Sequence, residues 1–275
     1  MKERLDVLLV KNGFCENLNI AKRFIMAGQV IVNEMKVDKA GTMIKISDDE
    51  LNIRIKGKKF PYVSRGGLKL EKALKVFNLN FQDKVILDVG ASTGGFTHCA
   101  LLNGAKHVYA VDVGTNQLDW KLRSDKRVTS LENTHIRDLK LEDIDNLKTD
   151  YIVMDVSFIS ITNIFEHLKT FFSSETKLMA LIKPQFEVEK SMLSKGGIVR
   201  EKDYQIFAIE RVIKEAKKNG LYLESLDYSP IKGGKGNSEY ISIFGILKKE
   251  DNINIEEIVN SCENLGGALW RNLKS

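Results

Sequence analysis

From about residue 63 onward, short apolar runs alternate with stretches in which apolar positions recur every three or four residues. The runs predict strands, and the helical spacing predicts helices between them. The predicted strands are residues 85–88, 108–112, 128–131, 151–155 and 178–182. Strands that alternate with helices are typical of a doubly wound, mostly parallel sheet. The pattern therefore predicts an α/β domain.

The last third of the chain extends this sheet. A long helix is expected at about residues 204–219, and two further strands near residues 221–229 and 240–247. We expect these two strands to form an antiparallel hairpin that closes a seven-stranded sheet. Ile255 and Ile258 then begin a final amphipathic helix.

The first 58 residues follow a different pattern. Apolar residues at i, i+3 and i+4 from Leu5 predict a short helix that ends near Gly13. Asn17 is suited to cap a second helix, and Gly28 is expected to end it. Strand-like runs follow at residues 30–32, 43–46 and 51–55. We predict a small α+β domain over residues 1–58, a linker at 59–62 and the α/β domain over 63–275.

The composition agrees with a globular protein of two domains, because 43% of the 275 residues are hydrophobic and 29% are charged. The N-terminus leads into a helical pattern instead of an apolar signal core, and no run reaches the roughly 18 apolar residues of a membrane helix. The three cysteines are far apart and lack metal-ligand spacing. We expect a reduced, cytoplasmic protein with no metal site and no membrane partner.

The charge is concentrated at the start of the chain. Residues 1–75 hold 16 Lys and Arg against 9 Asp and Glu, whereas the remaining residues hold 26 against 28. A basic leading segment on a near-neutral body is typical of a phosphate-binding module attached to an enzyme. A solvated Lys-rich surface would give the same counts, and charge alone does not separate the two.

A glycine-rich segment follows the first predicted strand of the α/β domain. Glycines here let a nucleotide-type cofactor approach the backbone N–H groups at the start of a helix. Ser92 stands where a dinucleotide fingerprint needs glycine, and the acids Asp88 and Asp112 at two strand ends suit a methionine sulfonium and a ribose better than a pyrophosphate. A merely structural turn is the alternative. The candidate cofactor residues are Asp88, Gly90, Ala91, Ser92, Thr93, Gly94, Gly95, Phe96, Asp112 and Asp155.

Asp155 and Lys183 end the fourth and fifth predicted strands. Adjacent parallel strands would bring these two side chains together at the cofactor edge of the sheet. The segment after Asp155 lacks the Pro-Pro-aromatic pattern of exocyclic amine methyltransferases, and no cysteine nucleophile for cytosine C5 is nearby. One interpretation is an ion pair that only stabilises the sheet edge. The other is that Lys183 orients or activates a hydroxyl acceptor such as a ribose 2′-oxygen.

These segments resemble the TlyA family of rRNA methyltransferases, also known as haemolysins, which are related to the FtsJ-like 2′-O-methyltransferases. The resemblance extends over essentially the whole chain. Its most specific segments are residues 63–70, 90–97, 155–160, 181–187 and 236–240. It implies a Rossmann-like class I methyltransferase, S-adenosylmethionine as cofactor and an N-terminal RNA-binding domain of the S4 type.

The resemblance also implies a catalytic tetrad. The family's Lys-Asp-Lys-Glu set matches Lys69, Asp155, Lys183 and Glu239, with Lys183 as the central group. It implies 2′-O-methylation of cytidine in the RNA of ribosomal subunits. The candidate RNA contacts are Arg4, Lys11, Lys22, Arg23, Arg65 and Lys69.

Two other functions remain open from the sequence. The haemolysin label suggests a membrane-lytic protein, although no spanning or long basic amphipathic helix is expected. A non-catalytic rRNA-binding assembly factor would retain the cofactor fold and bind RNA without transferring a methyl group.

Overall fold

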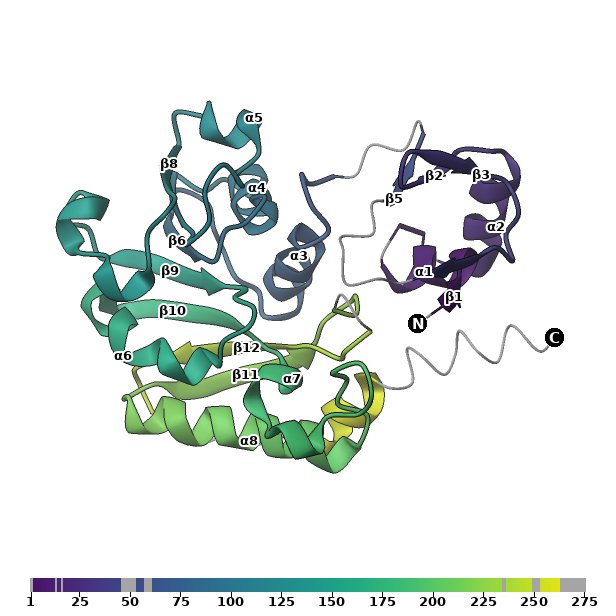
Figure 1. The fold of residues 1–275 in the computed structure, drawn as a ribbon. Helices are drawn as coiled ribbons and strands as arrows, with labels where there is room; N and C mark the ends of the chain where they lie inside the picture. The colour runs from purple at the N-terminus through teal and green to yellow at the C-terminus, as the bar shows by residue number, and fades with distance from the viewer. Residues whose placement is uncertain are drawn as a thin grey trace.

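The computed structural model describes residues 2–12, 14–15, 17–45, 53–56, 61–233, 236–248 and 253–262. Its N-terminal part combines two helices with short strands (Figure 1). These elements are β1 (Lys2–Arg4), α1 (Leu5–Lys11), α2 (Leu18–Met26), β2 (Val30–Val32), β3 (Met35–Val37), β4 (Met43–Lys45) and β5 (Ile53–Ile55). Strand β1 pairs with β4, and a second sheet has the order β3-β2-β5.

Both predicted N-terminal helices are confirmed. Asn17 caps α2, because its side-chain oxygen accepts a hydrogen bond from the Ile20 amide at 3.0 Å. Gly13, the expected end of the first helix, lies outside the described residues. The apolar pattern did not predict β1 and β3, because β1 (Lys-Glu-Arg) has no apolar residue and β3 (Met-Lys-Val) has only two.

The second part contains one seven-stranded sheet with the order β11-β12-β10-β9-β6-β7-β8. Its strands are β6 (Val85–Val89), β7 (His107–Val111), β8 (Val128–Leu131), β9 (Thr149–Met154), β10 (Phe172–Ile182), β11 (Tyr222–Tyr228) and β12 (Tyr240–Gly245). All neighbours from β10 to β8 are parallel, and β12 is antiparallel to both β10 and β11. The doubly wound sheet and its closing hairpin are therefore confirmed.

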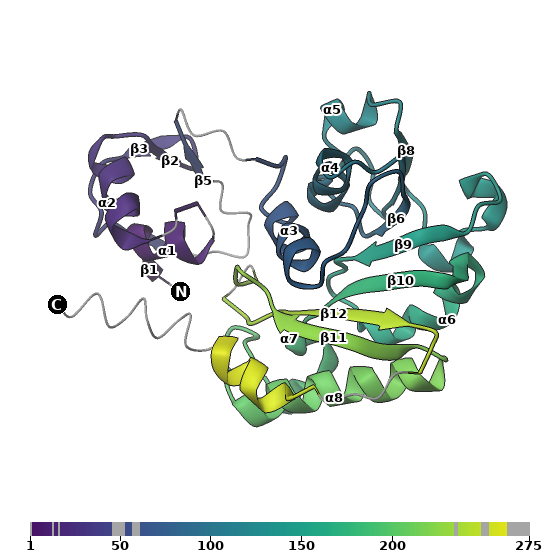
Figure 2. The same cartoon turned by 180° about the vertical axis from the view of Figure 1, so that it is seen from behind.

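Helices cover both faces of this sheet (Figures 1 and 2). They are α3 (Gly67–Val76), α4 (Gly95–Leu102), α5 (Trp120–Arg123), α6 (Phe165–Leu168), α7 (Pro184–Glu187), α8 (Lys202–Lys218) and a helix over residues 255–262. Short 3-10 turns lie at η1 (Ile136–Asp138), η2 (Leu141–Ile144), η3 (Ile161–Asn163), η4 (Lys169–Phe171) and η5 (Lys190–Met192). The sequence analysis named no helix at α3, because the glycines at its start obscure the helical pattern.

The alternation of strand side chains builds two cores. Ile86 packs with the apolar side of α3 and α4, whereas its neighbour Leu87 packs on the other face with α8. In the same way, Ile152 and Val153 of β9 pack on opposite faces of the sheet. Both faces of the sheet are thus buried, as the continuous apolar runs predicted. None of the described helices is both long enough and apolar enough to span a bilayer.

Candidate active site

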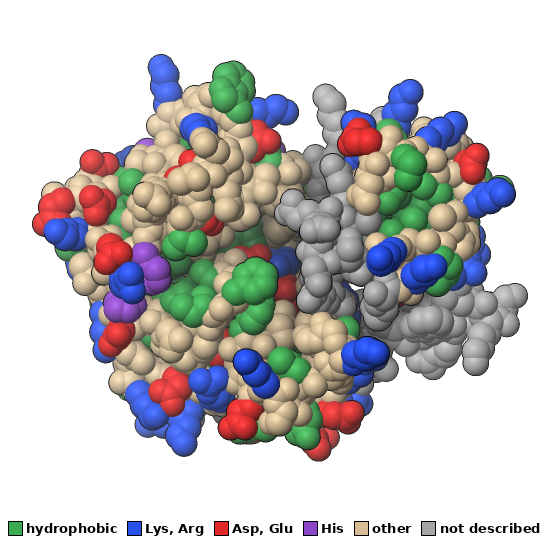
Figure 3. All heavy atoms as spheres, viewed as in Figure 1, with side chains coloured by type: hydrophobic (Ala, Val, Ile, Leu, Met, Phe, Trp, Pro, Cys, Tyr) green, Lys and Arg blue, Asp and Glu red, His purple; other side chains and the backbone are tan. Residues whose placement is uncertain are grey.

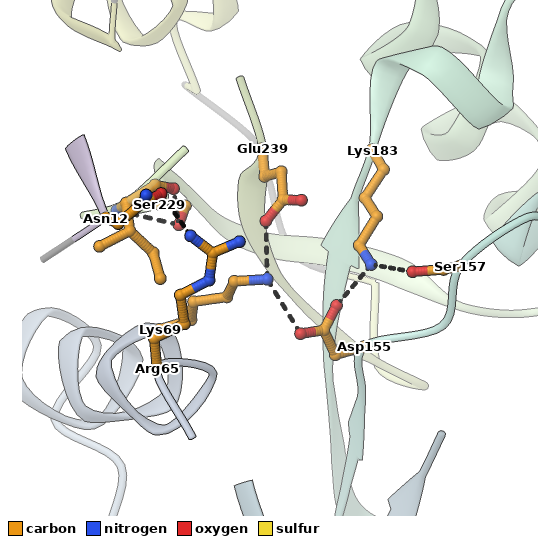
Figure 4. A network of polar contacts seen from close by, with 9 residues as sticks. Asn12, Arg65, Lys69, Asp155, Ser157, Lys183, Ser229 and Glu239 are labelled. Carbon is orange, nitrogen blue, oxygen red and sulfur yellow. Dashed lines mark hydrogen bonds and ion pairs between the residues drawn. The ribbon is translucent and has the colours of Figure 1, made fainter. Parts of the chain in front are cut away.

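Four charged side chains from separate elements meet at the carboxyl edge of the sheet (Figure 4). Asp155 follows β9 and Lys183 follows β10, and these strands are parallel neighbours. Glu239 precedes β12, which runs antiparallel to β10 and therefore begins at the same edge. Lys69 reaches this edge from α3. The predicted approach of Asp155 and Lys183 is confirmed, and the tetrad named by resemblance forms one cluster.

Ion pairs connect the cluster in a chain. Lys183 Nζ lies 2.7 Å from Asp155 Oδ1, and Lys69 Nζ lies 2.9 Å from Asp155 Oδ2. Lys69 Nζ also lies 2.7 Å from Glu239 Oε2. Each carboxylate oxygen of Asp155 thus faces a different ammonium group. The alternating order of charges fixes all four side chains relative to one another.

The cluster is electrically balanced and largely removed from water. Lys69, Lys183 and Glu239 are 7%, 6% and 3% exposed. Burial alone would raise the pKa of Asp155, but Lys69 and Lys183 outweigh it and hold that pKa well below its usual range. Burial likewise lowers the pKa of Lys69, and the charges of Asp155 and Glu239 overcome this to raise it. Asp155 and Lys69 are therefore both charged at neutral pH.

Ser157 adds a fifth group to this cluster. Lys183 Nζ donates a hydrogen bond to Ser157 Oγ at 2.8 Å, on the side away from Lys69. An ammonium group carries three N–H bonds. Among the described residues Ser157 accepts one of them and Asp155 is the ion-pair partner, which leaves Lys183 able to donate to a further oxygen. The sequence analysis did not identify Ser157, because a serine in a loop is an ordinary turn residue.

The glycine-rich loop lies beside this cluster, between β6 and α4. Gly90 has φ +80°, and a Cβ there would lie 2.9 Å from a methyl group of Val156. Gly94 has φ +95°, and a Cβ there would lie 2.3 Å from Leu122. Both positions require glycine for conformation and for space. The loop is therefore closely packed against its own neighbours, and the approach of a cofactor to its backbone stays a prediction.

Asp88 supplies an acid at the base of this loop. It is 1% exposed, and its Oδ2 accepts a hydrogen bond from Thr97 Oγ1 at 2.6 Å. Its other oxygen, Oδ1, is buried and has no hydrogen-bond partner among the described residues. Burial raises the pKa of Asp88 to about 7. An unpartnered carboxylate oxygen of this kind fits a cationic ligand such as the methionine end of S-adenosylmethionine.

Asp112 connects the loops that follow β6 and β7. Its Oδ2 accepts from the Ser92 amide at 2.8 Å, and its Oδ1 accepts from the Gly114 amide at 2.7 Å. The next residue, Val113, is 66% exposed and offers apolar surface at the same edge. A ribose contact by Asp112 stays a prediction, and the loop geometry is compatible with it.

The other cofactor candidates lie in two kinds of environment. Ala91 and Phe96 are buried, whereas Ser92 and Thr93 are exposed. Gly95 lies against the start of α3, where an added Cβ would lie 2.3 Å from Ser64 Oγ. Direct cofactor contacts by these residues stay predictions.

The candidate RNA contacts lie in different environments. Arg4 pairs with Asp6 and Lys11 pairs with Glu3, so both are engaged within the N-terminal part. Arg65 donates to the side chain of Asn12, which connects the start of the catalytic domain with α1. On α2, Lys22 is half-buried and Arg23 is exposed. Lys69 is held within the tetrad. Their roles in RNA binding stay predictions.

Phe158 is a further residue that the sequence analysis did not identify. It is 92% exposed and has φ +66°, a backbone conformation that residues other than glycine rarely adopt. Its ring centroid lies 5.5 Å from that of Phe186 on α7. In Figure 3 hydrophobic side chains gather at the middle of the face, next to acidic and basic ones. No local sequence pattern marks this ring, because its exposure and its positive φ appear only in the folded chain.

Comparisons with known proteins agree with this geometry. The FtsJ-like methyltransferase model matches residues 62–246, and the S4 domain model matches residues 3–50. YqxC of Bacillus subtilis, provisionally named an rRNA methyltransferase, is 48% identical over 87% of this chain and 84% of its own. The 16S/23S rRNA (cytidine-2'-O)-methyltransferase TlyA of Mycobacterium tuberculosis is 36% identical over 87% of this chain and 88% of its own. A solved structure from Streptococcus thermophilus, provisionally named a hemolysin, is 42% identical, covers 100% of this chain and 99% of its own, and has a TM-score of 0.78.

Proposed function

Because the chain belongs to the FtsJ-like methyltransferase family, we propose that it methylates the ribose 2′-hydroxyl of a cytidine in ribosomal RNA. The name of its Mycobacterium tuberculosis relative states this reaction. The observation that carries the proposal is the position of Lys183, paired with Asp155 at 2.7 Å and lying beside the glycine-rich loop. Ribosomal subunits would be the substrate, and the cytoplasm would be the place of action.

S-adenosylmethionine is the methyl donor, and when bound it supplies an electrophilic methyl group on a positively charged sulfur. Asp88 would hold its methionine end, since Oδ1 of this acid is buried without a partner. Gly90 and Gly94 would give the loop its positive φ angles, so that its backbone can follow the cofactor. Asp112 would hold the ribose hydroxyls, and Val113 would lie against the adenine.

A hydroxyl acceptor suits this cluster better than a base carbon. Methylation of cytosine C5 needs a cysteine thiolate. Cys99, on the helix after the cofactor loop, is buried in the core, and burial raises its pKa to about 12. A thiolate is therefore disfavoured there. The cluster instead offers ammonium groups, which stabilise negative charge that develops on an attacking oxygen.

In this mechanism Lys183 acts by orientation and electrostatics. An ion pair with Asp155 and a hydrogen bond to Ser157 fix its ammonium group, and a further N–H is directed to the 2′-oxygen. Lys69 holds Asp155 in the charged form that keeps Lys183 in place, and Glu239 pairs with Lys69 in turn. The proton of the attacking hydroxyl leaves to water. Placing the oxygen and the methyl group in line supplies much of the acceleration.

Phe158 would receive the base of the target nucleotide. A nucleotide must leave its stack before an enzyme can reach its sugar closely, and exposed aromatic rings hold such bases by stacking. The S4 domain would hold the surrounding RNA helix mainly through its phosphates.

The function is tested with methyl-labelled cofactor and separated ribosomal subunits, followed by mapping of the label. The expected product is a 2′-O-methylcytidine. An RNA that carries 2′-deoxycytidine at the mapped position should accept no label. Label on a base, or label that persists on the deoxy substrate, would contradict the proposal.

A function limited to RNA binding would not explain why the four charged side chains of the tetrad are buried together. Burying four charged groups costs free energy that a binding surface does not require. The membrane-lytic alternative finds no supporting feature in the part of the chain that the structure describes. Methyl transfer is therefore the function that the geometry favours.

We expect replacement of Phe158 by Ala to weaken RNA use. Loss of one stacked base costs about 1–3 kcal/mol, so KM for the RNA should rise about tenfold or more, whereas Kd for the cofactor should stay unchanged. Phe158→Tyr should keep most of the activity. Phe207→Ala, which removes another exposed phenylalanine, is the matched control. Equal losses in both alanine variants would count against a stacking role.

Cofactor affinity should depend on pH through Asp88. Because its pKa is raised to about 7, this carboxyl group becomes protonated as the pH falls below that value and then loses its attraction for a cationic ligand. Kd for S-adenosylmethionine, measured calorimetrically from pH 7.5 to pH 5, should rise by up to about tenfold per pH unit. Asp88→Asn should bind more weakly with little pH dependence. An equal slope in the variant would show that another group titrates.

A further inference from the structure

Glu187 is a buried acid outside the tetrad. It ends α7, four residues after Lys183, and is only 1% exposed. Its Oε2 accepts a hydrogen bond from Ser160 Oγ at 2.6 Å, and its Oε1 accepts from the Ile161 amide at 2.9 Å. Burial raises the pKa of this carboxyl group. An acid in such a place needs a reason, because burial disfavours its charge.

The two hydrogen-bond donors lie where the segment that follows β9 meets η3, because Ser160 ends this segment and Ile161 is the first residue of η3. Residues 155–160 of this segment form neither helix nor strand. The segment begins with Asp155 and carries Ser157 and Phe158. The groups expected to touch the substrate therefore lie on backbone that no ladder of regular hydrogen bonds supports.

Three residues at the end of β10 and in α7 hold this segment and the residue that follows it. Lys183 contacts Asp155 and Ser157, and Phe186 contacts Phe158. Glu187 then holds the residues that follow, through Ser160 and Ile161. The contacts of Glu187 are distinct, because they involve no group of the proposed reaction.

Phe158 itself gains little from its surroundings. At 92% exposure it buries almost no surface, and its positive φ costs free energy. Its conformation must therefore be imposed by the backbone on either side. Asp155 holds one end through the tetrad, and Glu187 holds the other.

We propose that Glu187 is a positioning residue that holds Phe158 in place to receive the target nucleotide. The proposal rests on the function given above. The contrasting possibility is that Glu187 only joins α7 to α8, since its carboxylate also lies 3.6 Å from Arg211 Nη1. That structural role would lower stability without involving Phe158.

Activity in a double-mutant cycle separates these roles. Because it removes the acceptor of two hydrogen bonds, Glu187→Ala should lower kcat/KM for the RNA about tenfold or more while Kd for the cofactor is unchanged. Glu187→Gln keeps an acceptor for the Ile161 amide and should recover most of this loss. In a Phe158→Ala background Glu187→Ala should have little further effect. Losses that multiply in the double variant would overturn the proposal.

Two further measurements are the activity of Ser160→Ala and amide hydrogen exchange. The first does not depend on Glu187 variants that fold poorly, and the second does not depend on the rate of methyl transfer. Ser160→Ala removes one of the two hydrogen bonds to Glu187 and leaves Glu187 itself in place. A smaller decrease in kcat/KM for the RNA is therefore expected. Exchange in a peptide covering residues 155–163 should become about tenfold faster in both alanine variants. Unchanged exchange would overturn the positioning role. Absence of methyl transfer in the unmodified protein would overturn the proposed function instead.

Discussion

Replacement of Lys183 by Ala should lower the rate of methyl transfer by about a thousandfold or more, because it removes the ammonium group directed at the 2′-oxygen. Loss of one preorganised charged donor has effects of this size when the group acts in the transition state. Kd for S-adenosylmethionine should stay within about twofold of the unmodified protein, because the proposed cofactor contacts come from other residues. Single-turnover transfer to rRNA and calorimetric cofactor binding measure the two quantities separately.

A second lysine–aspartate pair in the same sheet provides the control. Lys84 lies just before β6, and its Nζ is 3.0 Å from Asp150 Oδ1 at the opposite edge. Lys84→Ala removes the same charge from the same sheet but should leave methyl transfer near that of the unmodified protein. Lys183→Arg should remain strongly impaired, because a planar guanidinium cannot reproduce the contacts with both Asp155 and Ser157. Activity of Lys183→Ala equal to that of Lys84→Ala would reject the assigned role.

The approach of Asp155 to Lys183 could be predicted from the sequence because it depends on a general rule. Apolar runs identify strands, and neighbouring parallel strands present their carboxyl ends at one edge. Residues at the ends of β9 and β10 must then be close, whatever the loops do. The 2.7 Å separation of Lys183 and Asp155 follows from that rule and from their opposite charges.

Lys69 and Glu239 could be placed only by family resemblance. Lys69 lies on α3, which the apolar pattern did not identify as a helix. Glu239 depends on the insertion of β12 between β10 and β11, a pairing of residues distant in sequence that no local pattern records. The arrangement of the elements in the fold, which the sequence pattern does not reveal, brings these two residues into one cluster with Asp155 and Lys183.

Glu187 and Phe158 show a different limit. Each has an ordinary residue type for its local segment. Glu187 is unusual because it is buried, and Phe158 is unusual because it is exposed. A buried acid is recognised only when its donors, Ser160 and Ile161, are seen around it. An exposed phenylalanine is recognised only from its strained backbone and open surface. Such signals arise in the tertiary structure.

Asp155→Asn should have the largest effect on stability, because this one carboxylate is shared by two largely buried ammonium groups. Breaking a buried ion pair by removing one partner costs about 3–5 kcal/mol. Lys69 keeps Glu239 as a partner, so we expect the lower end of this range and a fall in Tm of roughly 10 °C. Methyl transfer should fall as strongly as in Lys183→Ala, since Lys183 loses the group that fixes it.

The pH dependence identifies the carboxylate as the source of this stability. The pKa of Asp155 is held below its usual range in the folded protein, so the unfolded chain takes up this proton first as the pH falls. The free energy of unfolding that Asp155 contributes should be fully present above about pH 5 and should be lost progressively below about pH 4. The difference between the unmodified protein and Asp155→Asn in urea denaturation should therefore be constant from pH 5 to pH 8 and should narrow at lower pH. Asp150→Asn, in the more exposed pair with Lys84, should cost less. A gap that widens on acidification would mean that Asp155 is not the shared counterion of Lys69 and Lys183.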